Sequence, residues 1–245
     1  MSYYIVGDKY QAFKAHKRVI TYSDFQALLN SSDVDPVAIK NTLVGQGVND
    51  SEREQLFMLM QHKNDSPASA VALKRADRRL THKHKNENIL ITCPEKLDDQ
   101  TYLSHLAIDD DSAQLSDHVT GQHIQGMVLI EAARQMTLAV TEQYFIEENE
   151  GIGFATDSLE TTFHRYTFPC DVQMYYTVLS HRQGFHKNAK YKVKITFVQN
   201  DFVCAEMIYG FSTYQQKFIQ GQERKQAEEV LSIQPISNSN LKKTA

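Results

Sequence analysis

Residues 125–145 hold the feature that most constrains the fold, a long run that is apolar around most of a helix. Its first fifteen helical residues read "GMVLIEAARQMTLAV", with charges only at Glu131 and Arg134. At a rise of 1.5 Å per residue, a helix over this run is about 30 Å long, enough to cross a small domain. A helix that is apolar on nearly every side must also be covered on nearly every side, so the rest of the chain has to wrap around it.

After Gly151 the pattern changes from a helical period to a period of two. Four runs show it: "SLETTFHRY", "DVQMYYTVLSH", "AKYKVKITFVQ" and "FVCAEMIYGFSTY". Apolar residues that alternate with polar ones indicate strands of an antiparallel sheet with one face on a core. The last two runs are joined tightly by "NDF" at 200–202, as in a hairpin. A curved antiparallel sheet around one long helix is the α+β hotdog fold, and this is the fold that the sequence predicts.

The remaining sequence divides around this unit. Residues 1–80 are mixed and partly helical, and we expect an N-terminal extension or a degenerate half-repeat there. Residues 81–216 form the predicted hotdog domain, and 217–245 form a polar tail. Within the first part, "DVDPVAIKNTLVGQG" predicts a helix, because Asp35 and Pro36 fit its start and Gly45 its end. Before the long helix, "NILITC" predicts a strand that ends at Pro94.

Composition excludes several classes of function. The chain has 245 residues and a formal net charge of −4, so nucleic-acid binding is not expected. No signal-like apolar segment opens it, and its longest apolar stretch, around 127–130, is far too short to span a membrane. Its three cysteines are far apart, which favours reduced thiols. These features predict a cytoplasmic protein without a membrane partner.

Chemistry concentrates in "LSDHVTGQHIQG", the polar run that leads into the long helix. It carries Asp117, His118 and His123, and the helix start at Gly126 and Met127 leaves backbone N–H groups unpaired. A helix start favours negative charge, so a carbonyl placed there would have its developing oxyanion stabilised. Histidine moves protons near neutral pH, and a carboxylate in apolar surroundings can have a raised pKa and do the same. The run therefore predicts acid–base chemistry.

Glu131 has two structural interpretations beside this functional one. It can pair with Arg134, three residues on along the same helical face, or it can face a polar seam between subunits. A metal site built from the nearby histidines is not expected, because their spacing fits no zinc pattern. The basic run 73–87 is interpreted as a solvated loop, with a dock for an acidic carrier protein or for coenzyme A phosphates as the alternative.

The segment "DHVTGQHIQGMVLIEAARQM" resembles the signature of the A-factor biosynthesis (AfsA-like) hotdog family. Two further segments extend the resemblance: "LTHKHKNENILIT", with its His82–Lys83 pair, and "KAHKRVITYSDF" near the N-terminus. The resemblance covers about 80–215 well and the first 30 residues weakly. The residues that match the signature are Asp117, His118, His123, Gly126, Met127, Glu131, Ala132, Arg134 and Gln135.

This resemblance implies a β-ketoacyl transferase. An acyl chain from an acyl carrier protein or coenzyme A would be joined to a hydroxyl of a small phosphorylated acceptor such as dihydroxyacetone phosphate. The product would be a precursor of a butenolide or furan signalling molecule. No cofactor is implied beyond the thioester substrate. Glu131 would act as general base or orient the acceptor, with His123 or His118 assisting, and Arg134 and Lys83 would meet the phosphate. The expected substrate-binding set is Asp117, Gly126, Met127, Arg134, Gln135, His82 and Lys83.

Two alternatives stay open. The long helix is also similar to that of hotdog dehydratases and thioesterases, although Gln125 stands where such dehydratases carry a proline, and Val119–Thr120 where they carry Phe-Pro. A non-catalytic acyl-binding or sensing protein is the other alternative. By analogy with other hotdog units we expect a homodimer, unless the N-terminal third fills the partner's place.

Overall fold

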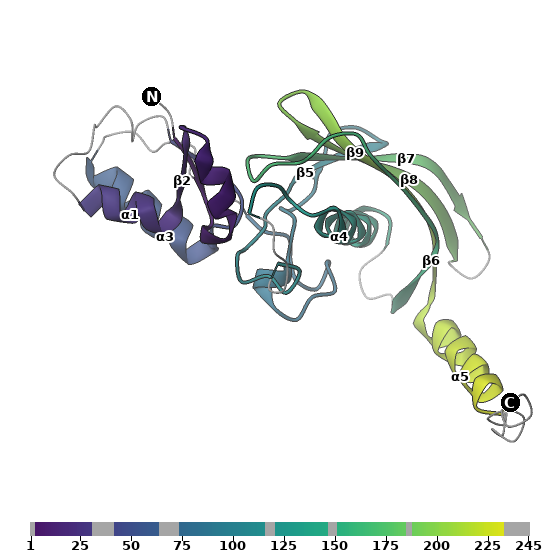
Figure 1. The fold of residues 1–245 in the computed structure, drawn as a ribbon. Helices are drawn as coiled ribbons and strands as arrows, with labels where there is room; N and C mark the ends of the chain where they lie inside the picture. The colour runs from purple at the N-terminus through teal and green to yellow at the C-terminus, as the bar shows by residue number, and fades with distance from the viewer. Residues whose placement is uncertain are drawn as a thin grey trace, which may run out of the picture.

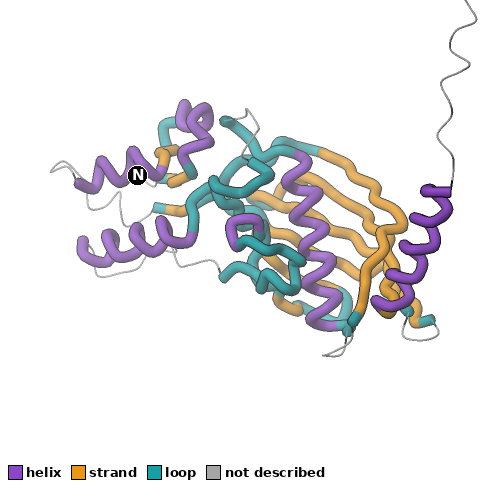
Figure 2. The backbone as a smooth tube through the Cα atoms, turned by 90° about the horizontal axis from the view of Figure 1, so that it is seen from below, coloured by secondary structure: helices purple, strands orange, loops and turns teal. Residues whose placement is uncertain are grey.

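The computed structural model describes residues 3–30, 42–63, 74–115, 121–146, 151–184 and 188–232. The larger part is a curved antiparallel sheet that wraps around helix α4 (Gly126–Tyr144), and a smaller N-terminal unit lies to one side of it (Figures 1 and 2). This arrangement confirms the predicted α+β hotdog fold. Helix α4 begins and ends within a residue of the predicted limits.

The curved sheet has the strand order β4-β5-β7-β8-β9-β6, with every neighbouring pair antiparallel. Asn200 and Asp201 join β8 to β9 with φ angles of 49° and 63°, the left-handed pair that a tight hairpin turn requires. The strands are β4 (Glu95–Lys96), β5 (Thr101–His105), β6 (Ile152–Phe163), β7 (Gln173–Gln183), β8 (Ala189–Gln199) and β9 (Phe202–Gln215).

The core lies between α4 and the concave face of this sheet. Alternation along β8 buries Tyr191, Val193, Ile195 and Phe197 and leaves the lysines between them on the convex face. From α4, the buried side chains are mostly small or aliphatic, which lets the helix lie close to the sheet: Val128, Leu129, Ala132, Ala133, Met136, Leu138, Ala139 and Val140. The predicted strand "NILITC" is wrong as a strand, because Ile91 and Thr92 make only isolated bridges to Leu106 and Arg75.

The N-terminal unit has a sheet of its own, in which β1 pairs in parallel with β2 and β3. The helix predicted around Pro36 falls mostly on 31–41, outside the described residues, and its last part is strand β3 instead. There Val44 pairs with Ile5, so the parallel sheet overrides the local helical pattern. Its elements are β1 (Tyr4–Val6), the 3-10 helix η1 (Asp8–Ala15), β2 (Val19–Thr21), α1 (Tyr22–Asn30), β3 (Leu43–Val44) and α3 (Asp50–Lys63).

Gln46 is the polar link between this unit and the hotdog domain. Its buried amide donates to the carbonyls of Leu106 and Cys170 at 3.0 and 3.2 Å, and its Oε1 accepts from the N–H of Ile108 at 2.7 Å. The next residue, Gly47, has a φ of 83° and no room for a Cβ, because the Asp110 carboxylate would lie 2.4 Å away. The chain therefore follows one path across the contact.

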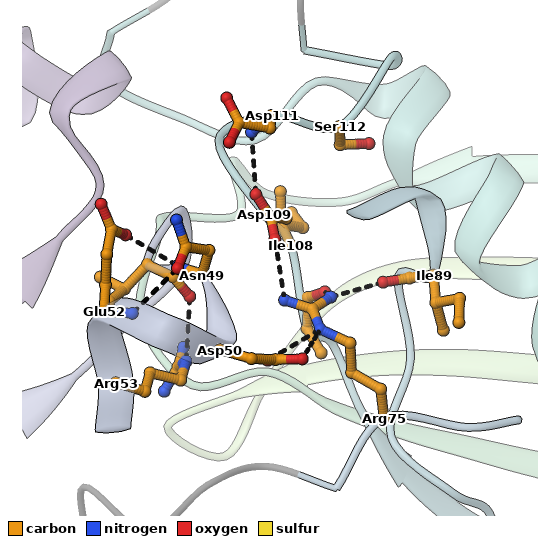
Figure 3. A network of polar contacts seen from close by, with 12 residues as sticks. Asn49, Asp50, Glu52, Arg53, Arg75, Ile89, Ile108, Asp109, Asp111 and Ser112 are labelled. Carbon is orange, nitrogen blue, oxygen red and sulfur yellow. Dashed lines mark hydrogen bonds and ion pairs between the residues drawn. The ribbon is translucent and has the colours of Figure 1, made fainter. Parts of the chain in front are cut away.

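Arg75 forms a second link (Figure 3). This buried guanidinium contacts Asp50 of α3 at 3.0 Å, Asp109 at 3.6 Å and the carbonyl of Ile89 at 2.6 Å. An apolar contact completes the junction: Phe13 of η1 stacks on Phe168 with ring centroids 5.4 Å apart. The N-terminal unit is thus fixed to the segments that precede and follow the predicted site.

At the other end of the chain, helix α5 (Gln216–Ser232) follows β9 and projects from the sheet, with no buried side chain (Figure 1). Among the described helices, none combines the length and the apolar character needed to cross a membrane.

Replacing Gln46 with alanine should destabilise the protein, because Ile108 N–H and the carbonyls of Leu106 and Cys170 lose their buried partner. We expect a loss of about 3 kcal/mol in the free energy of unfolding, measured by urea denaturation. Gln220→Ala on the exposed face of α5 is the matched control and should change stability by less than about 0.5 kcal/mol. Equal stability of the two variants would contradict the role given to Gln46.

Candidate functional site

Helix α4 begins without a side-chain cap. Its N-cap, Gln125, has extended backbone and makes no capping hydrogen bond, and the first turn carries no acidic residue. Within the described residues its first N–H groups have no side-chain partner and can donate to a ligand, and the helix dipole adds partial positive charge at this end. Glycine at position 126 lets the end of the exposed Phe163 ring lie against the helix start, where a Cβ would be 2.7 Å from the ring.

A cavity of about 440 Å³ opens at this end of α4. A hydrogen bond from Ile124 N–H to the carbonyl of Thr167, at 2.7 Å, joins the two segments that form the walls of this cavity. One wall comes from the approach to α4 and the other from the end of β6 and the segment after it. The lining residues are His123, Ile124, Gly126, Leu129, Phe163, His164, Arg165, Tyr166 and Thr167.

His123 is the predicted catalytic histidine that the structure describes in this cavity. Its ring lies 4.7 Å from the ring of Tyr166, centroid to centroid. The predicted residues Asp117 and His118 fall on 116–120, outside the described residues. The cavity thus brings together two predicted site residues, His123 and Gly126, while Met127 faces outward with 68% of its surface exposed.

Glu131 lies five residues after Gly126, about 7.5 Å further along the axis of α4. Its carboxylate receives a bidentate contact from Arg134, with Nε and Nη2 at 2.8 and 2.9 Å. Lys83 Nζ lies 2.6 Å away and Gln135 Nε2 3.0 Å away. The predicted residues Lys83, Arg134 and Gln135 therefore converge on Glu131, which makes the Arg134 bridge one part of a larger network.

The network fixes Glu131 in its charged form. Burial alone raises the pKa of Glu131, but hydrogen bonds from Arg134, Lys83 and Gln135 outweigh it and lower the pKa to about 2. The expectation that this carboxylate has a raised pKa is therefore wrong, because opposite charges surround it instead of apolar side chains. At neutral pH Glu131 is a carboxylate that accepts hydrogen bonds and has little affinity for a proton.

Gln135 connects the network to the backbone before β4. Its buried amide accepts from Leu90 N–H at 2.8 Å and donates to the Asn88 carbonyl at 2.9 Å, in addition to its bond with Glu131. His82, the neighbour of Lys83, contacts Glu142 of α4 at 2.5 Å and packs against Phe154 of β6. The predicted His82–Lys83 pair thus fastens its loop to α4.

The basic run is largely neutralised by this arrangement. The members that contact a carboxylate are Arg75, Arg79, His82, Lys83 and Lys85. Within the described ranges, no group of three or more His, Cys, Asp or Glu side chains is arranged to hold a metal ion.

Sequence reasoning missed one wall of the cavity. The segment "FHRYT", 163–167, is the end of β6 and the turn that follows, and the pattern of alternation identified it only as strand. The signal was nevertheless present, because three chemically active side chains, His164, Arg165 and Tyr166, come directly after an exposed strand. Loops that follow strands often carry functional residues.

The topology and the site define a hotdog-domain protein. The model of the A-factor biosynthesis hotdog domain (AfsA) matches residues 64–215, and the chain belongs to this family. The resemblance drawn from the motif is confirmed.

Solved structures with a similar backbone fold include three thioesterases. A mutant thioesterase from Pseudomonas aeruginosa is 13% identical, with 58% of this chain and 97% of that chain covered and a TM-score of 0.41. One from Haemophilus influenzae is 13% identical, with 58% and 95% covered and a TM-score of 0.40. A hypothetical thioesterase with coenzyme A from Streptococcus pneumoniae is 14% identical, with 50% and 85% covered and a TM-score of 0.35. No curated protein matches the chain.

Glu131→Gln should lower the free energy of unfolding at neutral pH by about 2 kcal/mol, because Arg134 and Lys83 lose their counter-charge. The lowered pKa of Glu131 means that its stabilisation is present above pH 4.5 and is lost as the pH falls toward about 2. The difference between wild type and variant should therefore shrink over this interval.

Denaturation by urea from pH 7 down to the acid limit of the native state measures this difference. Glu223→Gln, on the exposed face of α5, is the control and should show no such trend. A Glu131→Gln difference that is independent of pH would contradict the assigned network.

Proposed function

We propose that the protein is an acyl-thioester-dependent transferase. It moves a β-ketoacyl chain from an acyl carrier protein or coenzyme A to the hydroxyl of a small phosphorylated acceptor such as dihydroxyacetone phosphate. Membership of a family described by A-factor biosynthesis supports this class of chemistry and its place in making a butenolide or furan signal. The observation that carries the proposal is the uncapped start of α4, which opens into a cavity beside His123.

The thioester carbonyl lies at the start of α4, where the N–H groups of Gly126 and Met127 donate to its oxygen. They stabilise the negative charge that develops as the acceptor hydroxyl attacks. His123 takes the hydroxyl proton as the new C–O bond forms. The C–S bond then breaks, and His123 returns the proton to the departing thiolate, which leaves an ester and a free thiol.

Glu131 has an orienting role in this scheme. A carboxylate with a pKa of about 2 is a poor general base at neutral pH, so the alternative predicted for it, orientation, is the one we retain. Its bonds to Arg134, Lys83 and Gln135 connect α4 to the loop that holds His82, so Glu131 holds the helix that presents the site in position. Lys83 and Arg134, predicted to meet the phosphate, are held by Glu131 instead.

Mass spectrometry tests the reaction on purified protein with β-ketoacyl thioesters of coenzyme A or carrier protein, with and without dihydroxyacetone phosphate. We expect an ester that depends on the acceptor. His123→Ala should lower kcat roughly 100-fold, because it removes the proton carrier, and Glu131→Ala roughly 10-fold or more. His84→Ala, an exposed histidine of the basic run, is the control and should keep full activity.

Each alternative function gives a different product. Release of free acid without acceptor would mean that water takes the place of the hydroxyl, which is a thioesterase. An enoyl thioester would mean a dehydratase. A bound acyl chain without turnover would mean an acyl-binding protein. Full activity of folded Glu131→Ala would remove Glu131 from the mechanism.

A homodimer belongs to the same proposal. Within the described residues β6 is an edge strand of twelve residues, and the N-terminal unit lies on the opposite side of α4, so it does not fill a partner's place here (Figure 1). Beside this edge Met127, Leu159 and Phe163 are exposed apolar side chains. A second copy paired along β6 would supply partners for the edge and cover these side chains.

Light scattering after size exclusion should give twice the 28.1 kDa of one chain. Leu159→Lys should shift the protein toward monomer, because it puts a charge into the expected contact. Leu97→Lys, at an exposed leucine beside β4, is the matched control and should leave the dimer intact. A monomeric wild type would contradict the dimer.

A further inference from the structure

Arg165 occupies a position that the scheme above leaves unassigned. It lines the cavity at the start of α4 and also a second cavity of about 370 Å³, which continues toward the β8–β9 turn. The two cavities share Arg165 and Tyr166, so they are neighbours, with these two residues on the wall between them. The second is lined by Arg165, Tyr166, Phe168, Gln199, Asn200, Phe202 and Cys204.

The guanidinium of Arg165 lies over an aromatic ring. Its Cζ lies 4.3 Å from the centroid of Phe202, whose own surface is half exposed. A guanidinium over the face of a ring gains from the cation–π attraction, and its N–H groups can still donate to a ligand. A guanidinium presented in this way matches the two oxygens of a phosphate.

The surroundings of Arg165 also favour an anion. His123 and His164 line the same cavity, and so does the uncapped start of α4. Thr167 is buried in this wall, and its hydroxyl has no hydrogen-bond partner among the described residues. The carboxylate that contacts His164, Glu206 at 3.1 Å, is also bonded to Lys194 at 3.1 Å, so its charge is already balanced.

Lys83 and Arg134, the cations expected from the sequence to bind phosphate, differ from Arg165 because a carboxylate already occupies them. Lys83 and Arg134 both contact the Glu131 carboxylate, which neutralises one charge between them and fixes their donors. Arg165 instead stacks on a ring and faces two cavities. Phosphate recognition therefore fits this side of α4 better than the side of Glu131.

We infer that Arg165 is the phosphate-recognition residue of this site. The inference rests on the proposed function, because it takes the reacting carbonyl to lie at the start of α4. The phosphate can have two sources. In a small phosphorylated hydroxy ketone it lies a few bonds from the reacting hydroxyl, so both fit in the larger cavity. In a phosphopantetheine arm it lies further away, and the second cavity provides the path.

The test compares wild type with Arg165→Gln, which we expect to keep the fold because Arg165 is exposed. One arm measures the ratio of kcat/KM for dihydroxyacetone phosphate to that for dihydroxyacetone, with an N-acetylcysteamine thioester as donor. The other measures the ratio for coenzyme A to N-acetylcysteamine thioesters. Arg165→Gln should lower one ratio roughly 10- to 100-fold, since a charged bidentate contact is lost.

The arm that changes identifies the source of the phosphate, either the acceptor or the pantetheine arm. Arg182→Gln, an exposed arginine of β7 outside both cavities, is the control and should leave both ratios unchanged. If wild type is active and neither ratio changes in Arg165→Gln, the inference is overturned while the proposed function stands.

If wild type shows no turnover, the proposed function fails, and the phosphate site is then tested by measuring binding affinities calorimetrically. Dihydroxyacetone phosphate and 4′-phosphopantetheine are the probes, each compared with its form lacking phosphate. Weaker binding of a phosphorylated probe to Arg165→Gln than to Arg182→Gln would support the phosphate site. Equal binding to the two variants, or no binding to wild type, would overturn it.

Discussion

The burial of α4 in the hollow of a six-stranded sheet is the constraint on which the rest of the structure depends. Small side chains such as Ala132 and Ala139 let the helix approach the sheet closely, and the aromatic residues of β7 and β8 fill the remaining space. Because most of α4 is buried, its first turn is positioned against Phe163 at the end of β6. A start that lacks its own cap can therefore point its N–H groups at a fixed place in the cavity instead of fraying.

The same helix separates two kinds of polar chemistry. On one side the carboxylate of Glu131 is bonded to Arg134, Lys83 and Gln135, and these bonds attach the loop of Lys83 to the helix. At its start the cavity is lined by Arg165, whose guanidinium lies over the Phe202 ring, and by Thr167, whose buried hydroxyl has no partner among the described residues. Charge pairs that are complete stabilise a structure, whereas groups left open at a cavity are the ones that recognise a ligand.

Periodicity predicted the hotdog domain well, because a helix of period 3.6 and strands of period two leave distinct patterns along one chain. It was wrong where distant segments decide the outcome: Val44 is a strand because Ile5 lies beside it, and Ile91 has too few partners to make a ladder. For the candidate site, the motif indicated Glu131 and its helical neighbours, and the structure shows that they contact one another. The contact with Lys83 and the wall at Arg165 depend on how loops are placed in space, which spacing along the sequence does not encode.

The stacking of Phe13 on Phe168 has a thermodynamic consequence. Phe168 lines the second cavity, and Phe13 N–H also donates to the carbonyl of Gly121, on the approach to His123, at 2.7 Å. The N-terminal unit therefore supports residues that line or adjoin the two cavities, although none of its own residues lines them. Any ligand that binds more tightly when these walls are in place must, by linkage, strengthen the attachment of the N-terminal unit by the same factor.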